Sequence, residues 1–261
     1  MSKRAGFSIE VKDVSFAYPG TSNLALDHVS FEIKNGETIS FVGLNGAGKT
    51  TLIKLLCRFY RPSSGEILVN GVSIYDYSAA EYMEQIGSIF QDFKLFPVSI
   101  KNNVSFHEDG KKVASILSLL GMERVISRWP DGVDSFYDRT FSKEGIGLSG
   151  GEAQKIALAR ALIRDAGLII LDEPTSTLDP IAEADFYENL RANTKGRTTI
   201  FVSHRMSSSV FSDRIFVFSN GKLEAQGSHE ELMKEEKGLY YELFTHQAKG
   251  YQETDLIFEK A

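Results

Sequence analysis

The segment that most restricts what this chain can fold into is residues 43–50, Gly-Leu-Asn-Gly-Ala-Gly-Lys-Thr. It fits the pattern G-x-x-x-x-G-K-[ST], follows a short apolar run and precedes a stretch with helical periodicity. Small residues let such a loop wrap a phosphate so that backbone N–H groups point inward, and the next helix adds the positive end of its dipole. The segment therefore predicts a phosphate-binding loop between a strand and a helix.

The side chains of this loop have separate expected roles. We expect the Lys49 ammonium to bind the β- and γ-phosphate oxygens of a nucleotide and the Thr50 hydroxyl to ligate Mg²⁺. Thr51 is placed to reach the α-phosphate. A dinucleotide-binding fingerprint is excluded, because Thr51 occupies the position where that pattern needs its third glycine. The other residues expected to contact phosphate are Gly43, Asn45, Gly46, Ala47 and Gly48.

A second chemical feature is the apolar run 168–171, which ends in Asp172 and Glu173. This pattern is typical of a buried parallel strand that carries charge to the carboxyl edge of its sheet, where ligands bind. Asp172 is the expected partner of Mg²⁺, directly or through water. Glu173 is the candidate general base that polarises the attacking water.

Turn signals and periodicity predict an α/β chain. The strands expected before the phosphate-binding loop are followed by a helix and a hairpin, and the region 94–166 is mostly helical. Two later strands separated by a helix favour parallel pairing with a crossover. The expected strands are 9–18, 26–33, 38–43, 167–173 and 198–204, the helices are 50–59, 111–121, 152–163 and 181–193, and hairpin turns are expected at Asn35-Gly36 and Asn70-Gly71. The charged tail 228–252 is expected to be a solvated helix.

Composition excludes several classes of protein. The 35 acidic and 29 basic residues give a net charge of −6, which disfavours non-specific binding of nucleic acid. The single cysteine, Cys57, excludes an intrachain disulfide and indicates a reducing compartment. Apolar runs are far shorter than the roughly 20 residues that a membrane-spanning helix needs. We therefore expect no membrane span, no exported leader and no DNA partner.

A third motif, Leu148-Ser149-Gly150-Gly151-Glu152, opens the predicted helix 152–163. A helix start with Ser149 as its cap and two glycines offers N–H donors and a hydroxyl to an anion, so it is a second candidate phosphate site. With these motifs in place the sequence resembles the ATP-binding domain of ABC transporters over nearly its whole length. The resemblance implies a RecA-like P-loop NTPase core with an antiparallel β subdomain, 1–93 and 167–261, and an inserted helical subdomain, 94–166.

The resemblance also implies ATP and Mg²⁺ as ligands and a head-to-tail dimer. In that family the phosphate-binding loop of one domain and the signature motif of the other, here residues 149–152, enclose each ATP. Weaker family matches give Tyr18 as the aromatic that stacks on adenine and Gln91 as a ligand of Mg²⁺ or the attacking water. They also give Asp179 in the loop 176–179 at the dimer interface and His204 as the contact to the γ-phosphate.

The segment 94–104 and the tail from residue 227 resemble the exporter subclass, whereas residues 142–147 depart from the acidic–arginine–glycine pattern common there. The resemblance implies transmembrane partner domains, on another chain or outside this sequence, and a second nucleotide-binding domain that is identical or different. It also implies a place on the cytoplasmic side of the membrane and solubility in isolation. The transported substrate is not encoded here.

Three alternatives stay open to different degrees. DNA-maintenance ATPases also carry both phosphate motifs, but they insert long coiled coils or DNA-reading domains where this chain has fewer than a hundred residues without heptads, between Thr50 and Leu148. A regulatory module without hydrolysis predicts the loss of Glu173 or His204, and both are present. An importer subunit remains compatible with the motifs.

Overall fold

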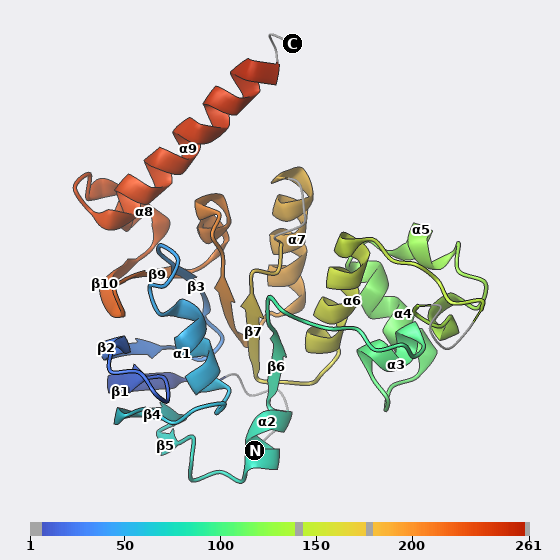
Figure 1. Cartoon of the computed structure of the whole chain (residues 1–261), viewed down its shortest axis with the longest axis horizontal. Helices are drawn as coiled ribbons and strands as arrows, with labels where there is room; N and C mark the ends of the chain where they lie inside the picture. The colour runs from blue at the N-terminus through green and yellow to red at the C-terminus, as the bar shows by residue number, and fades with distance from the viewer. Residues whose placement is uncertain (1–6, 139–142, 176–179, 259–261) are drawn as a thin grey trace.

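The computed structural model describes residues 7–138, 143–175 and 180–258. They form two sheets with helices packed around them and a group of short helices at one end of the molecule (Figure 1). The helices are α1 (Lys49–Leu56), α2 (Ala79–Glu84), α3 (Ile100–Val104), α4 (Gly110–Leu119), α5 (Glu123–Ile126), α6 (Gly150–Leu162), α7 (Pro180–Asn193), α8 (His229–Lys234) and α9 (Leu239–Phe258), with 3-10 turns η1 (Gly132–Asp134) and η2 (Met206–Phe211).

The larger sheet has the strand order β10-β9-β3-β8-β7-β6. All neighbours in it are parallel except β10, which pairs antiparallel with β9. The strands are β3 (Thr38–Val42), β6 (Ile86–Ile89), β7 (Leu168–Asp172), β8 (Thr198–Val202), β9 (Arg214–Ser219) and β10 (Lys222–Gly227). Helix α7 makes the crossover between β7 and β8, as the alternation of strands and helix predicted.

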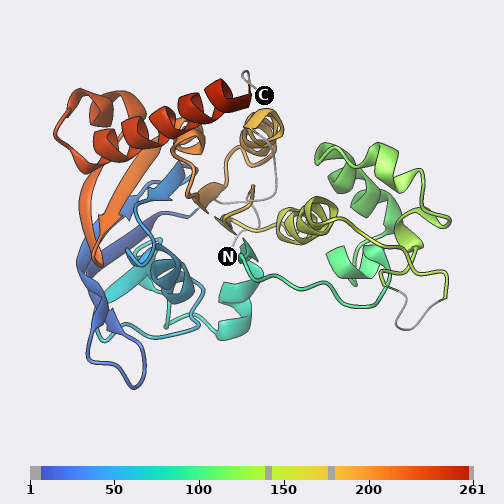
Figure 2. The ribbon, with the colours of Figure 1, turned by 45° about the horizontal axis from the view of Figure 1, so that its top comes forward.

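The smaller sheet is antiparallel, with the order β2-β1-β4-β5. Its strands are β1 (Ile9–Ala17), β2 (Leu24–Ile33), β4 (Ser64–Val69) and β5 (Val72–Ser73). The apolar faces of both sheets and the buried side of α1 share one hydrophobic core, so α1 is fixed between the sheets (Figure 2). The fold is therefore the mixed α/β arrangement that the sequence predicted.

One of the two predicted hairpins is wrong. Asn70 and Gly71 both have positive φ, 51° and 75°, and connect β4 to β5 as a hairpin of the expected kind. The Asn35-Gly36 turn instead passes the chain from one sheet to the other, because β3 is buried on both faces and pairs in parallel with β8 and β9. The Gly36 N–H donates to the Thr198 hydroxyl of β8 at 3.0 Å, which fixes this crossing.

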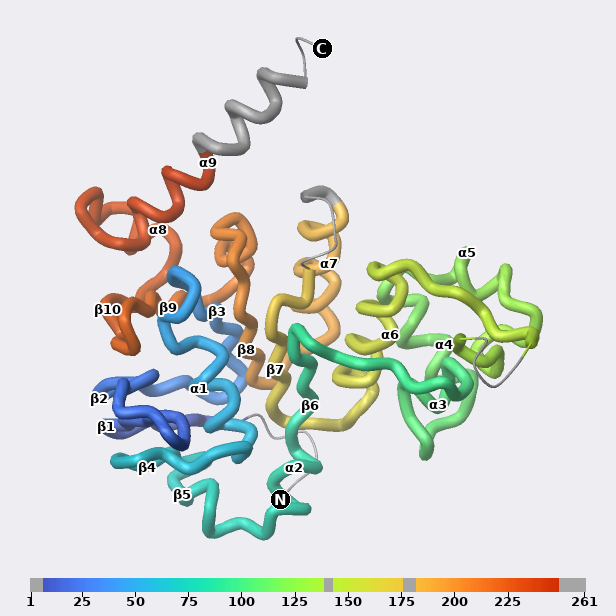
Figure 3. The backbone as a smooth tube through the Cα atoms, in the orientation of Figure 1, coloured from blue at the N-terminus to red at the C-terminus, as the bar shows by residue number. Residues whose placement is uncertain are grey.

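Helices α3, α4 and α6 form a second hydrophobic core that also includes β7 side chains. Helix α6 contacts the sheet directly, since a Cβ on Gly87 of β6 would lie 2.3 Å from the Ala161 carbonyl oxygen. The boundaries at residues 94 and 166 stay a prediction. Figure 3 shows α3–α5 grouped on the far side of α6 from β6.

The expectation of a fully solvated tail is wrong. Tyr240 of α9 is 1% exposed and Leu232 of α8 is 4% exposed, and both pack with Val42, Ile215 and Met206 in a third core. The charged residues of the tail had indicated a solvated helix, but only one side of its described part faces solvent. In the part of the chain that the structure describes, no helix is long and apolar enough to cross a membrane.

Candidate functional site

The phosphate-binding loop lies at the carboxyl end of β3 and runs into α1. Gly43 has a φ of +140°, and a Cβ there would lie 2.1 Å from the Phe218 carbonyl oxygen of β9. Gly48 precedes α1 with a φ of +102°. Side chains are therefore excluded at both positions by backbone conformation and close packing. The loop lines a pocket of about 380 Å³, together with Gln91, Glu173 and His204.

Lys49 lies inside this loop and is only 5% exposed. Its ammonium donates to the carbonyl oxygens of Gly43 at 2.7 Å and Leu44 at 2.9 Å. Burial lowers the pKa of Lys49, and the nearby carboxylates of Asp172 and Glu173 oppose that change. A buried cation held by backbone carbonyls at a helix start suits the binding of a phosphate.

Thr50 and Asp172 form the candidate metal site. The Thr50 hydroxyl lies 3.2 Å from Oδ2 of Asp172, which ends β7 and is 3% exposed. Burial raises the pKa of Asp172, and the Thr50 hydrogen bond opposes the rise. Hydroxyl and carboxylate oxygens are the protein ligands that Mg²⁺ uses beside phosphates and water, so this pair fits the ion. No cluster of three His, Cys, Asp or Glu side chains suited to a metal occurs among the described residues.

Glu173 is held from both sides. The Gln91 Nε2 donates to its Oε2 at 2.9 Å, and the His204 Nε2 lies 2.5 Å from its Oε1. Its φ of +53° is unusual for a residue with a side chain. The backbone is fixed by the Glu173 N–H, which donates to the Val202 carbonyl at 3.0 Å, and by Gln154 Nε2 of α6, which donates to the Glu173 carbonyl at 3.0 Å.

A buried network that sequence reasoning missed supports the two loops carrying Glu173 and His204. The Thr175 hydroxyl donates to Oε1 of Glu183 at 2.6 Å, and Arg205 donates to the other oxygen at 2.9 Å. Glu183 lies on α7 and is 3% exposed. The sequence around Glu183 is that of an ordinary helix. It does not indicate that Glu183 is buried, because the hydrogen-bond partners of Glu183 lie on two loops distant in the sequence. Gln154 was missed for the same reason.

Tyr18 follows β1 and lies beside α1. Its ring packs edge-on against Phe16 and Tyr60, at centroid distances of 5.0 and 5.3 Å. Its hydroxyl lies 3.1 Å from the Thr51 hydroxyl. The structure therefore brings an aromatic ring next to the helix that begins at the phosphate-binding loop.

The signature residues lie apart from this pocket. Ser149 caps α6 and forms a capping box with Glu152, and both Ser149 and Gly150 are exposed. The described lining of the pocket includes none of the residues 149–152. The second candidate phosphate site is therefore presented to solvent, where another molecule can reach it. The Asp179 prediction lies outside the described residues.

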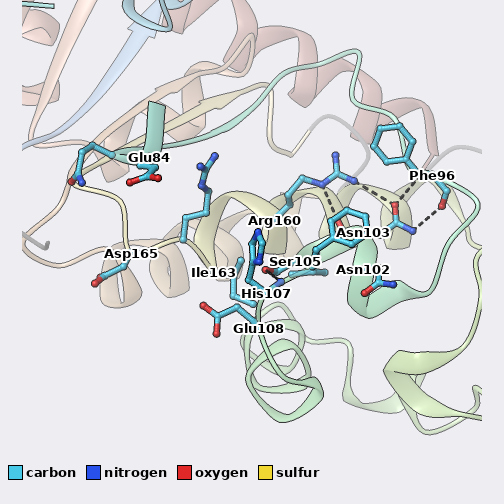
Figure 4. A pocket seen from close by; sticks show the side chains of 14 residues that line it. Glu84, Phe96, Asn102, Asn103, Ser105, His107, Glu108, Arg160, Ile163 and Asp165 are labelled. Carbon is cyan, nitrogen blue, oxygen red and sulfur yellow. Dashed lines mark hydrogen bonds between the residues drawn. The ribbon is translucent and has the colours of Figure 1, made fainter. Parts of the chain in front are cut away.

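A larger groove of about 550 Å³ lies between α3, the end of α6 and the region of α2 (Figure 4). Arg160 crosses it, donating from Nε to the Asn103 carbonyl at 2.7 Å. Phe96 and Phe106 line it and are 57% and 68% exposed. The groove is connected to the site through the segment between Gln91 and Phe96.

Comparison with known proteins decides the family. A family model described as ABC transporter matches residues 26–176, which is more than half of the chain. The chain belongs to the ABC transporter family. The subtilin transport ATP-binding protein SpaT of Bacillus subtilis is 39% identical over 232 residues, covering 87% of this chain and 38% of the relative. The ATP-dependent lipid A-core flippase of Paraburkholderia xenovorans is 39% identical over 246 residues, covering 92% of this chain and 40% of that protein.

A solved bacterial Atm1-family ABC exporter with ATP bound has a similar structure. It is 35% identical, with a TM-score of 0.84, and the match covers 92% of this chain and 42% of that one. The chain thus corresponds to the ATP-binding part of exporter-type ABC transporters. It spans about two fifths of the length of the relatives that it matches.

Proposed function

We propose that this chain hydrolyses Mg²⁺-ATP and that the hydrolysis drives transport through partner transmembrane domains, at the cytoplasmic side of the membrane. The observation that carries the proposal is the Glu173 carboxylate, held between Gln91 and His204 at the mouth of the phosphate-binding loop. A carboxylate at this place is suited to accept the proton of a water that attacks the γ-phosphate.

The remaining residues bind and orient the nucleotide. Lys49 and the loop N–H groups neutralise phosphate charge, and the Tyr18 ring offers a face for adenine. Thr50 and Asp172 would hold Mg²⁺, with Gln91 as a further ligand. Bound there, the ion supplies charge neutralisation at the β- and γ-phosphates. His204 is placed to contact the γ-phosphate and to orient Glu173.

The exposed signature supports a head-to-tail dimer, identical or mixed, in which Ser149–Glu152 and Asp179 of one domain close the ATP site of the other. A phosphate site presented to solvent on the capped start of α6 is complete only when a second molecule brings a phosphate to it. Activity should therefore rise more steeply than linearly with protein concentration.

The test is the ATPase rate against protein concentration with Mg²⁺, together with size-exclusion chromatography of Glu173→Gln with and without ATP. We expect Glu173→Gln to bind ATP, to lose turnover and to dimerise with ATP. Glu224→Gln, an exposed glutamate on β10, is the matched control and should behave as the parent chain. Undiminished hydrolysis by Glu173→Gln would contradict the role of Glu173 as general base. An ATPase rate strictly proportional to protein concentration would contradict the proposed dimer.

We place the transmembrane partner in the groove lined by Phe96 and Phe106. Two exposed aromatic side chains beside the half-buried Arg160 are typical of a protein contact, and residues 91–96 link the groove to Gln91 in the nucleotide pocket. Phe106→Asp should abolish co-purification with a co-expressed transmembrane partner and leave hydrolysis by the isolated chain within about twofold. Val72→Asp, at an exposed position of the smaller sheet, is the control. Retained co-purification of Phe106→Asp moves the contact elsewhere.

A further inference from the structure

The loop that carries His204 is bonded to the C-terminal helix. The Gln247 Nε2 of α9 donates to the His204 carbonyl at 2.8 Å, and the Met206 N–H donates to the Gln247 Oε1 at 2.5 Å. One side-chain amide therefore bonds to the backbone on both sides of Arg205. The two bonds act on the residue that contacts Glu173 and on the start of η2.

Helix α9 is well fixed where Gln247 leaves it. The buried Tyr240 hydroxyl lies 2.8 Å from the Ser209 hydroxyl of η2 and 2.7 Å from the His229 Nδ1 of α8. Leu243 and Phe244 pack against the core that contains Met206. Polar and apolar contacts thus hold the same face of α9 against η2, so the backbone position of Gln247 is fixed.

The side chain of His204 itself has little packing to orient it. It is 42% exposed, and its ring is held at Nε2 by Glu173. Its direction is therefore set mainly by the backbone of the loop, which Gln247 bonds on either side of Arg205. A pocket of about 470 Å³ lies between Gln247, Leu243, His204 and the first residues of the phosphate-binding loop, so α9 approaches the nucleotide site directly.

We propose that Gln247 is a positioning residue for ATP hydrolysis, which orients His204 toward Glu173 through the loop backbone. This inference rests on the proposed function, and it extends the site to a helix outside the residues 26–176 that match the family model. Among the described residues, Gln247 is not part of the lining of the pocket formed by the phosphate-binding loop, Gln91, Glu173 and His204. Its loss should slow turnover while leaving ATP binding intact.

The test uses Gln247→Met, which keeps the length of the side chain and removes both hydrogen bonds. Gln226→Met, at an exposed position of β10, is the matched control. Losing two hydrogen bonds that orient one catalytic group should lower kcat about tenfold, with KM for ATP and its Kd within about twofold. An unchanged kcat overturns the proposal. Equal losses of kcat, ATP affinity and folded fraction overturn it too, because they indicate a purely structural role.

A second measurement does not need turnover. In chain labelled with ¹⁵N in the histidine rings, each of the five histidines gives two ring-nitrogen signals, and His204→Gln identifies the pair from His204. We expect Gln247→Met to shift these signals and Gln226→Met to leave them in place. If Gln247→Met has a lower kcat but the His204 signals do not shift, the proposal is contradicted, because the reduced turnover then does not arise from a change at His204. If Glu173→Gln still hydrolyses ATP, the proposed function fails instead, whatever the histidine spectrum shows.

Discussion

The imidazole Nε2 of His204 lies 2.5 Å from the Oε1 of Glu173. The register of two parallel strands brings these residues together, since Asp172 of β7 pairs with Val202 of β8, Glu173 is the next residue after Asp172, and His204 lies two residues after Val202. Parallel strands end at a common edge, so a carboxylate and an imidazole from distant parts of the sequence meet there. The pair is thus positioned by the sheet before any ligand enters.

Asp172→Asn should stabilise the fold while stopping Mg²⁺-dependent hydrolysis. Burial raises the pKa of Asp172 in the native state, so its charged form costs stability at every pH above that native value. The cost disappears as the pH falls below about 4, where the unfolded chain is also protonated. We therefore expect a higher Tm for the variant at pH 7 without Mg²⁺, and a smaller difference in acid.

The control for that measurement is Asp76→Asn, at an exposed aspartate with no expected change in Tm. A lower Tm for Asp172→Asn at pH 7 would mean that the attraction to Lys49 and the Thr50 hydrogen bond outweigh burial.

Because Glu173 has a positive φ, glycine should be more stabilising than alanine at this position, the reverse of the usual order in a strand. Glycine adopts a φ of +53° without strain, so Glu173→Gly should unfold with a free energy about 1 kcal/mol higher than Glu173→Ala. In β10 the order should reverse, with Glu224→Ala more stable than Glu224→Gly. Urea unfolding of the four variants measures both differences, and equal stabilities at position 173 would show that the turn relaxes.

Tyr18 should contribute to ATP affinity through its ring alone. Tyr18→Ala removes a base-stacking face worth about 1–3 kcal/mol, so its Kd for ATP should rise about tenfold or more. Tyr18→Phe keeps the ring and loses only the contact to Thr51, and we expect a Kd within about twofold of the parent. Titration with a fluorescent ATP analogue measures both, and equal losses would assign the effect to the hydroxyl.

Cys57 should resist thiol reagents in the folded chain. It lies on the buried side of the residues that end α1, and burial raises the pKa of its thiol to about 12. The thiolate that such reagents need is therefore scarce at pH 8. We expect slow labelling by a disulfide reagent in buffer and rapid labelling in urea, whereas rapid labelling of the native chain would show that the core opens readily.

Local patterns predicted the parts of the site that are local in sequence. The phosphate-binding loop and the Asp172-Glu173 strand end were recognisable because the residues of each motif are adjacent in the sequence. Their order alone therefore predicts the local structure that brings them together. The Asn35-Gly36 turn misled, since a turn dipeptide specifies a reversal of direction and not which sheet receives the next strand. Burial of β3 on both faces decided that, and burial depends on β8 and β9.

Contacts between distant segments could not be predicted. Glu183 and Gln247 lie in amphipathic helices, where a polar residue is expected on the solvent side. Each instead bonds to a loop that is close only after the sheet and its helices have assembled. The many charged residues of the tail likewise led to the wrong expectation that it is solvated. Tyr240 is buried there because it packs against η2, which is distant in the sequence.

The bond from Gln154 to the Glu173 carbonyl joins two parts that serve different nucleotides in the proposed dimer. Gln154 lies five residues after Ser149 on a rigid helix, so a tilt of that helix toward the neighbour's phosphate pulls on the turn that carries its own chain's base. In the proposed dimer this bond would link the two ATP sites, because a nucleotide held by one chain's signature residues would act on the turn that carries the same chain's Glu173.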